Sequence, residues 1–243
     1  YANNLDTTFA LLRVGLAHGI RSFVFSSTGT VYSDPADLPF TEESTTSVDL
    51  SNAYSKSKRM NEVVLADVAR VNPDVNVTVL RYFNPVGAHT SGLIGEDPTG
   101  IPNNLMPYVS RVAIGALERI GVFGDDYDTP DGTGLRDYIH VVDLADGHVS
   151  ALEKAAPGYA VYNLGTGRPV SVLELISSFE KAVGRKLPTQ ILDRRPGDVA
   201  ATYCDPAKAE RELGWKARFG IDEASRDYWT WQSQNPQGYA TAE

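Results

Sequence analysis

Apolar positions along the chain follow a helical period in some stretches and a strand-like pattern in others. The first stretch carries an imperfect helical stripe, with Leu5, Phe9, Leu12 and Leu16, that closes near Gly19. A short, nearly continuous apolar run at 21–27 predicts a strand buried on both faces. The pattern therefore predicts a helix followed by a buried strand at the start of the chain.

The same alternation continues to the end of the chain. Helical patterns cover 53–71, 105–117, 142–155, 172–183, 206–213 and 221–234, and strand patterns cover 76–82, 119–124, 138–142, 159–164 and 189–192. Strands that alternate with helices of a dozen residues indicate βαβ units and a mostly parallel sheet. The predicted class is α/β, and a change to loop-rich sequence near 82–84 suggests a domain boundary there.

Composition fits one large or two small globular domains. The chain has 243 residues, and 22 basic against 31 acidic side chains give a net charge of −9. This acidic balance argues against nucleic acid or an anionic membrane as the main partner, although a few local arginines would suffice for an anionic small molecule. No apolar run is long enough to span a bilayer, and no basic-then-apolar segment opens the sequence, so neither a spanning helix nor a signal peptide is expected.

Cysteine and histidine usage narrows the chemistry further. The single cysteine, Cys204, cannot form an internal disulfide, which predicts a reducing, cytoplasmic location. The four histidines show no metal-ligand spacing, so no metal site is expected. His140 and His148 are interpreted as structural residues with satisfied hydrogen bonds.

A tyrosine and a lysine one helical turn apart are the first candidates for chemistry. Tyr54 and Lys58 are four residues apart in a predicted helix, so they share a face. A cation beside a phenol favours the phenolate, so we expect Lys58 to lower the pKa of Tyr54 and to make it a general base. The simpler interpretation is a surface pair without function.

A cluster of hydroxyl side chains favours the functional interpretation of this pair over the surface pair. Ser26, Ser27 and Thr28 come directly after a predicted strand, and the carboxyl ends of parallel strands are where α/β folds place reactive groups. A hydroxyl there can hydrogen-bond both a substrate hydroxyl and the phenol.

Together these motifs resemble the extended short-chain dehydrogenase/reductase family. The resemblance rests on FSSTGTVY at 25–32 and YSKSK at 54–58. It narrows to the UDP-glucose 4-epimerase family through LRYFNPVGAH, GEDPTGIPNNLMPY, DGTGLRDYIHVVDLADGH, YNLGTG and RRPGD, which follow one another between 80 and 198. The resemblance covers nearly the whole chain. Several long, polar motifs in the same order as in the family are very unlikely to agree by chance.

The resemblance implies a reaction and roles for the first candidates. Tyr54 would take the proton of the sugar 4-hydroxyl while the hydride at C4 passes to NAD. Lys58 would hold the phenolate and bind the nicotinamide ribose, and Thr28 would share the proton. It also implies cofactor contacts from Asn3, Ser26, Ser27 and Tyr82.

Further residues would hold the UDP-hexose substrate. The implied set combines amide, aromatic, cationic, carboxylate and hydroxyl side chains with one apolar residue at a helix start: Thr28, Phe83, Asn84, Asn104, Leu105, Phe123, Arg136, Tyr138, Arg195, Asp198 and Thr202. The small residue at Thr202 predicts that N-acetylated UDP-hexosamines are accepted too.

Several of these residues also have simpler interpretations. Asn84 precedes a proline and would shape a turn. Asn104 would cap a helix, Arg136 would pair with Asp137 on the surface, and Phe123 would belong to a core.

The chain departs from the family pattern at its start. The family opens with a strand and a glycine-rich turn that holds the dinucleotide pyrophosphate, and no such turn follows a strand in this sequence. We therefore expect a chain without the N-terminal strands of its Rossmann sheet, which alone would bind NAD poorly and be inactive. The expected domains are 1–84, with Tyr54 and Lys58, and 85–243, a smaller substrate domain with some segments returning to the sheet.

Two alternative functions remain open, and a homodimer is the expected assembly. One alternative is a related NAD-dependent sugar-nucleotide dehydratase or reductase, which the absence of an acidic residue beside Thr28 disfavours. The other is an inactive fragment that only binds. The first helix and the helix at 53–71 could pair with a second copy, so a homodimer is expected.

Overall fold

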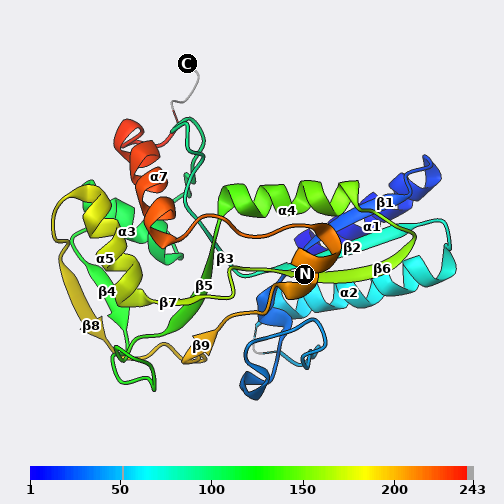
Figure 1. Cartoon of the computed structure of the whole chain (residues 1–243), viewed down its shortest axis with the longest axis horizontal. Helices are drawn as coiled ribbons and strands as arrows, with labels where there is room; N and C mark the ends of the chain where they lie inside the picture. Colours follow the sequence, from blue (N-terminus) through cyan, green and yellow to red (C-terminus); the bar gives the residue numbers. More distant parts are fainter. Residues whose placement is uncertain (51, 240–243) are drawn as a thin grey trace. The chain divides into compact units, whose positions relative to one another are not determined.

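The computed structural model describes residues 1–50 and 52–239, and the chain divides into two compact units. Unit 1 comprises 1–83, 144–167 and 202–216, and unit 2 comprises 84–143, 168–201 and the chain from 217 onward. Each unit is therefore assembled from three separate stretches of sequence (Figure 1).

Unit 1 is built on a three-stranded parallel sheet in the order β1-β2-β6. The strands are β1 (Ser22–Thr28), β2 (Asn76–Tyr82) and β6 (Gly158–Leu164). The central β2 is buried along nearly its whole length, whereas β1 is only half-buried until its last two residues. The expectation that β1 is buried on both faces is wrong, because β1 is an outer strand of the described sheet.

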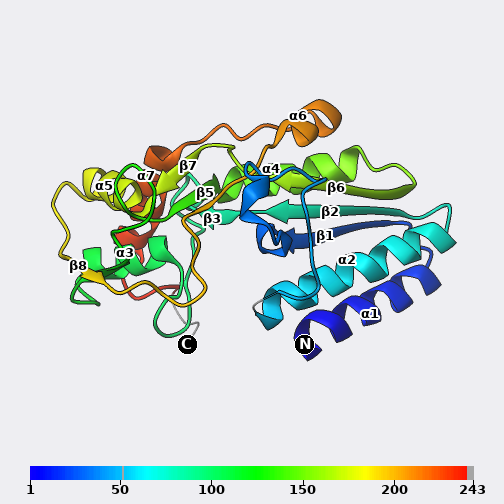
Figure 2. The ribbon, with the colours of Figure 1, turned by 90° about the horizontal axis from the view of Figure 1, so that it is seen from below.

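Helices cover both faces of this sheet. Figure 2 shows α1 (Ala2–Ala17) and α2 (Ala53–Val71) on one side of the strands and α4 (Val141–Glu153) on the other. The core on the α2 side contains Leu12, Leu65, Val77 and Val79. Because α2 packs directly on the strands, side chains in its first turns lie close to the carboxyl end of β1.

Short elements complete unit 1. Two 3-10 turns, η1 (Gly29–Val31) and η2 (Pro35–Asp37), follow β1, and α6 (Ala207–Leu213) comes late in the chain. Asn52 caps α2 by accepting a hydrogen bond from the amide of Ser55 at 2.8 Å. This cap fixes where the helix with Tyr54 begins.

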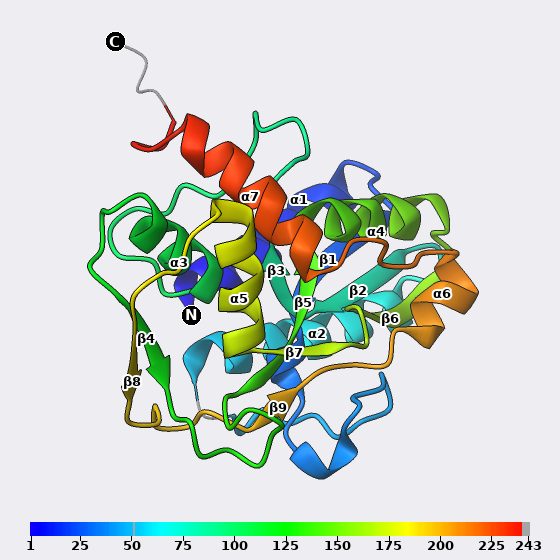
Figure 3. The ribbon, with the colours of Figure 1, turned by 60° about the vertical axis from the view of Figure 1, so that its left-hand side comes forward.

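Unit 2 contains two small sheets and three helices (Figure 3). One sheet pairs β3 (Asn84–Val86) in parallel with β5 (Leu135–His140), and β5 in turn pairs antiparallel with β7 (Pro169–Ser171). The other pairs β4 (Ile120–Phe123) in parallel with β8 (Thr189–Leu192). The helices are α3 (Leu105–Ala113), α5 (Val172–Val183) and α7 (Ile221–Gln234), and β9 (Ala201–Thr202) follows late in the chain.

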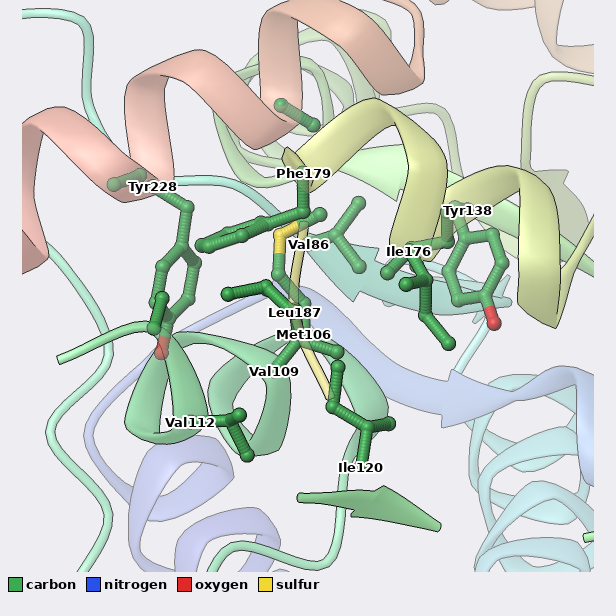
Figure 4. Packing of buried hydrophobic residues seen from close by; sticks show 14 of the residues in the cluster. Val86, Met106, Val109, Val112, Ile120, Tyr138, Ile176, Phe179, Leu187 and Tyr228 are labelled. Carbon is green, nitrogen blue, oxygen red and sulfur yellow. The ribbon is translucent and has the colours of Figure 1, made fainter. Parts of the chain in front are cut away.

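The core of unit 2 holds these elements together. Figure 4 shows Met106 and Val109 of α3 packed with Phe179 of α5 and Tyr228 of α7. The rings of Phe179 and Tyr228 meet edge to face, with their centroids 6.2 Å apart. This packing fixes the start of α3 relative to the small sheets, which matters for the pocket described below.

The helices were easier to predict than the short strands. The bounds of α2, α5 and α7 agree with the sequence patterns, whereas β3, β7 and β9 were not expected. Within the described residues, no helix combines the length and apolar character needed to cross a bilayer.

Candidate functional site

The first part of the candidate site lies in unit 1, between the end of β1 and the first turns of α2. Lys58 Nζ donates a hydrogen bond of 2.8 Å to the carbonyl oxygen of Ser26. The same ammonium is 5.7 Å from the centroid of the Tyr54 ring and 5.1 Å from that of Phe25. Tyr54 is 48% exposed, so its ring is accessible while it stays beside the lysine.

The pKa of Tyr54 differs from the expectation. Burial of the phenol and then the neighbouring Tyr82 raise the pKa of Tyr54 above its ordinary value, and a hydrogen bond from Thr28 acts in the opposite sense. The expectation of a lowered Tyr54 pKa is therefore wrong for the protein alone, in which burial has the largest effect. Lys58 directs a hydrogen bond to Ser26, and partial burial lowers its own pKa.

A short row of hydroxyl groups leads away from Thr28. The Thr28 hydroxyl lies 3.1 Å from the Thr30 hydroxyl, which lies 2.7 Å from the hydroxyl of Ser55 on α2. Thr28 itself is almost fully buried. The row connects the phenol of Tyr54 to groups that can share a proton.

The residues expected at the cofactor take different positions. The Ser26 hydroxyl lies 3.0 Å from His148 Nε2, and the Ser27 hydroxyl donates to Glu62 Oε1 at 2.5 Å. Tyr82 is partly exposed at the end of β2. Asn3 is exposed on α1. The structure thus groups Ser26 and Tyr82 with Tyr54 and Lys58, whereas the Ser27 side chain is directed to Glu62.

The second part of the candidate site is a pocket of about 660 Å³ in unit 2. Most of the residues expected at the substrate line it: Asn84, Asn104, Leu105, Phe123, Arg136, Tyr138, Arg195 and Asp198. They come from β3, α3, β4, β5 and the loop after β8. Residues far apart in the sequence are thus brought to one cavity.

Cationic and aromatic groups alternate on the pocket wall. The guanidinium carbon of Arg195 lies 3.7 Å from the centroid of the Phe123 ring. Arg136 donates to the carbonyl oxygens of Leu135 and Val199, and its guanidinium is 3.6 Å from a carboxylate oxygen of Asp198. The simpler interpretation of Arg136 as half of a surface pair with Asp137 is wrong, because Asp137 is buried and the guanidinium lies beside Asp198 in the pocket.

The start of α3 contributes backbone donors to the pocket. Asn104 occupies the N-cap position, but its side chain makes no capping hydrogen bond. The Asn104 side chain lies near Glu96, where burial raises the pKa of the carboxyl and Asn104 acts in the opposite sense. The backbone N–H groups of Leu105 and Met106 have no carbonyl partner within the helix, and Pro107, the third residue, has no N–H. Such a helix start favours a phosphate group.

Other expected substrate residues lie outside this pocket. Thr28 and Thr202 belong to unit 1. The Phe83 ring is buried with Tyr32 and Phe40 in unit 1. A Cβ atom on Gly29 would lie 2.8 Å from that ring, so the glycine after Thr28 permits the close approach.

Sequence analysis missed other residues of the pocket. Arg119, Tyr127 and Gln190 also line it. Arg119 directly precedes β4, and Gln190 belongs to β8. These two paired strands form one wall of the pocket. The pairing of Gly121 with Gln190 depends on a register between distant strands, which no local pattern reveals.

His148 was expected to be a structural residue with satisfied hydrogen bonds, and both of its ring nitrogens have partners. Its Nδ1 lies 2.9 Å from the carbonyl oxygen of Leu144, and its Nε2 contacts Ser26. His140 is buried, and its Nδ1 accepts a hydrogen bond from the amide of Val142. Its Nε2 is buried without a hydrogen-bond partner among the described residues, 3.5 Å from a carboxylate oxygen of Asp227, so the expectation of satisfied hydrogen bonds is wrong for this nitrogen. In the part of the chain that is described, no group of acidic, histidine or cysteine residues could hold a metal ion.

Comparison with known proteins extends the resemblance. The model of the NAD dependent epimerase/dehydratase family matches residues 1–165. A UDP-glucose 4-epimerase of Bacillus subtilis is 54% identical over 245 residues, which cover 100% of this chain and 72% of the relative. That of Caenorhabditis elegans is 52% identical over 244 residues, which cover 99% of this chain and 70% of the relative.

Solved structures agree with this assignment. A UDP-glucose 4-epimerase from Bifidobacterium longum in complex with NAD+ and UDP has a TM-score of 0.93 and 54% identity, over 98% of this chain and 71% of that one. A UDP-Glc/GlcNAc 4-epimerase from Campylobacter jejuni has a TM-score of 0.80 and 31% identity, over 96% of this chain and 71% of that one. The chain therefore belongs to the NAD-dependent epimerase/dehydratase family and has its α/β fold.

Proposed function

We propose that the protein interconverts UDP-glucose and UDP-galactose by reversible hydride transfer between C4 of the sugar and NAD. The observation that carries the proposal is the half-exposed Tyr54 ring beside the Lys58 ammonium, which is itself hydrogen-bonded to the end of β1. Relatives more than 50% identical that are named UDP-glucose 4-epimerases support it.

The groups at the end of β1 fit the nicotinamide end of this cofactor. The Lys58 ammonium has three N–H donors, and the Ser26 carbonyl takes one of them. Together with the half-exposed Tyr54 and the partly exposed Tyr82, it offers donors suited to ribose hydroxyls. When bound, NAD would supply the hydride acceptor and donor for C4 of the sugar.

Tyr54 and Thr28 then handle the proton. The phenolate of Tyr54 would accept the proton of the sugar 4-hydroxyl, and the Thr28 hydroxyl would donate to that phenolate. Because burial raises the pKa of Tyr54 in the protein alone, a positive charge is needed to favour the phenolate. Lys58 supplies one such charge from the same face of α2.

The pocket of unit 2 would hold the nucleotide. Three arginines against one aspartate, together with the start of α3, suit a diphosphate. The Phe123 ring suits a flat base, and Asp198 can accept from ribose hydroxyls. This binding lets the protein grip the UDP group while the hexose stays free to turn over.

The dehydratase alternative finds no support beside Thr28. Dehydration needs an acid–base pair next to the sugar C5–C6 bond. The side chains in hydrogen-bond contact along the row from Thr28 are the hydroxyls of Thr30 and Ser55. We therefore retain epimerisation as the reaction.

The proposed substrate range includes N-acetylated UDP-hexosamines. It is supported by the small side chain of Thr202, and by a relative from Campylobacter jejuni that is named a UDP-Glc/GlcNAc 4-epimerase.

The test replaces the phenol and keeps the ring. Tyr54→Phe should lower kcat for UDP-galactose by about two to four orders of magnitude, the usual contribution of a positioned general base. The dissociation constant of UDP, measured by calorimetry, should stay within about twofold because the pocket lies in unit 2.

The matched control is Tyr162→Phe, which removes another phenol of unit 1, one that donates to Glu212. This variant should keep kcat within about twofold. Wild-type protein that binds UDP and NAD but leaves UDP-galactose unchanged would refute the function itself.

A further inference from the structure

We propose that Ser27 and Glu62 are positioning residues for the Tyr54 acid–base group, because the bond between them joins the end of β1, where Thr28 lies, to α2, the helix with Tyr54 and Lys58. The inference rests on the proposed function and assigns a role to a buried cluster that the reaction itself does not use. The cluster consists of Ser27, Arg59, Glu62 and Arg81, and we call it the Glu62 cluster.

Glu62 is the centre of the Glu62 cluster. Its side chain is fully buried on α2. One carboxylate oxygen accepts from the Ser27 hydroxyl at 2.5 Å and from Arg81 Nε at 3.0 Å. The other accepts from an Arg81 NH group at 2.7 Å and from Arg59 at 3.2 Å. The carboxylate thus joins β1, β2 and its own helix.

Burial makes the cluster an unusual element of a core. Arg81 is 4% exposed and Ser27 is fully buried. Removing two charges from water is costly, and a buried ion pair is often no more stabilising than apolar residues of the same volume. Stability alone is therefore a weak reason for it, and its place in the fold suggests a positional role.

That place is next to the reactive residues on both elements. Ser27 lies between Ser26, whose carbonyl accepts from Lys58, and Thr28, whose hydroxyl bonds the phenol. Glu62 lies one helical turn after Lys58 on α2. Two bonds therefore connect the helix to consecutive residues of the strand, Lys58 to Ser26 and Glu62 to Ser27.

Loss of the Ser27 bond should disturb the neighbouring residue. Without it, the end of β1 can shift against α2, and Thr28 would no longer donate to the phenol in a fixed geometry. Because that hydrogen bond lowers the pKa of Tyr54, its loss should raise the pKa further. The titratable groups beside Tyr54 are Lys58 on α2 and Tyr82 on β2, and both are unchanged by the substitution.

The experiment compares Ser27→Ala with a matched control. Ser27→Ala removes one hydroxyl and leaves Glu62 paired with Arg81 and Arg59, so the variant should fold. The control, Ser178→Ala, removes another buried, hydrogen-bonded serine hydroxyl, in unit 2.

Two readouts are measured on both variants. The first is the pH profile of kcat and KM for UDP-galactose. The second is the ultraviolet difference titration of Tyr54, obtained by subtracting the matching variant that carries Tyr54→Phe. The second readout needs no epimerisation, so it separates failure of this inference from failure of the proposed function.

Ser27→Ala should move the alkaline-rising limb of kcat and the Tyr54 titration to higher pH by the same amount. A shift of about half a unit to one unit lowers kcat at neutral pH by about three- to tenfold. KM should stay within about twofold, and Ser178→Ala should shift neither readout.

A second pair of variants tests Glu62 itself. Glu62→Gln leaves the Arg81 charge poorly compensated, so it should lower the free energy of unfolding as well as kcat. The double variant Glu62→Gln, Ser27→Ala should have nearly the same pH profile as Glu62→Gln alone, because both substitutions act through one bond. If Ser27→Ala leaves the Tyr54 titration and kcat unchanged, or if its loss of activity matches its loss of folded protein, the inference is overturned.

Discussion

The size of the Thr202 side chain is proposed to decide whether N-acetylated UDP-hexosamines are accepted. The side chain is partly exposed, and its volume is small. Thr202→Tyr should suppress turnover of UDP-N-acetylgalactosamine by at least about tenfold, because a bulky ring would occupy the space that the acetyl group needs. Turnover of UDP-galactose should change by less than about threefold.

Competition kinetics with both substrates in one reaction measures this ratio directly. The control is Ala201→Ser, which alters the adjacent residue by one hydroxyl and should leave the ratio unchanged. Equal losses on the two substrates after Thr202→Tyr would contradict the proposed range.

At the same scale, spacing predicted which residues meet but not how they behave. The spacing of Tyr54 and Lys58 placed the ammonium near the phenol, as the structure has it. It could not reveal that burial raises the pKa of Tyr54 or that Lys58 donates to Ser26. Likewise, Ser27 was expected at the cofactor, but Glu62 accepts its hydroxyl. Burial and hydrogen-bond partners depend on elements that come together only in the fold.

At the scale of elements, Ser171 connects the start of α5 to the loop before β5. Its hydroxyl accepts from the Glu174 amide at 3.0 Å, and the Glu174 carboxylate accepts from the Ser171 amide. The same hydroxyl donates to Asp131, which also accepts from the amide and hydroxyl of Thr133. Ser171→Ala should therefore lower the free energy of unfolding by about 1–2 kcal/mol, as for other lost helix caps.

Chemical denaturation at several pH values measures this loss. Burial raises the pKa of Asp131, but hydrogen bonds from Ser171 and Thr133 outweigh it and hold the pKa below its usual range. A lowered carboxyl pKa stabilises the fold at neutral pH, and that contribution is lost as the pH falls through it. The difference in the free energy of unfolding between wild type and Ser171→Ala should thus become smaller in acid. The control, Ser177→Ala on the exposed face of α5, should lower the free energy of unfolding by less than about 0.5 kcal/mol at every pH.

Long elements were predictable and short ones were not. The helix α2 has a periodic apolar face and an Asn52 cap, both visible in the sequence, so its bounds were found. The strands β3 and β7 are each three residues long, and they exist because β5 lies between them. A pattern of three residues carries no period, so only the tertiary fold defines such strands.

At the scale of the whole molecule, the homodimer stays a prediction. Leu11 and Val14 on α1 are 64% and 52% exposed, and Val63 on α2 is 43% exposed. We expect light scattering to give the mass of two chains, and Leu11→Glu to give the mass of one, because a charge would be buried in the pair. Val149→Glu, at an apolar residue of α4 that is 53% exposed, should leave the mass unchanged. A wild-type mass of one chain would contradict the expectation.

The interleaved order of the two units has a consequence for biosynthesis. β1 and β2 are translated before 84–143, the first stretch of unit 2, whereas β6, the neighbour of β2, is translated only after it. A ribosome must therefore complete much of unit 2 before unit 1 can close its sheet. Until then one long edge of β2 lacks its neighbour, and an unpaired strand edge exposes the nascent chain to pairing with other chains during this interval.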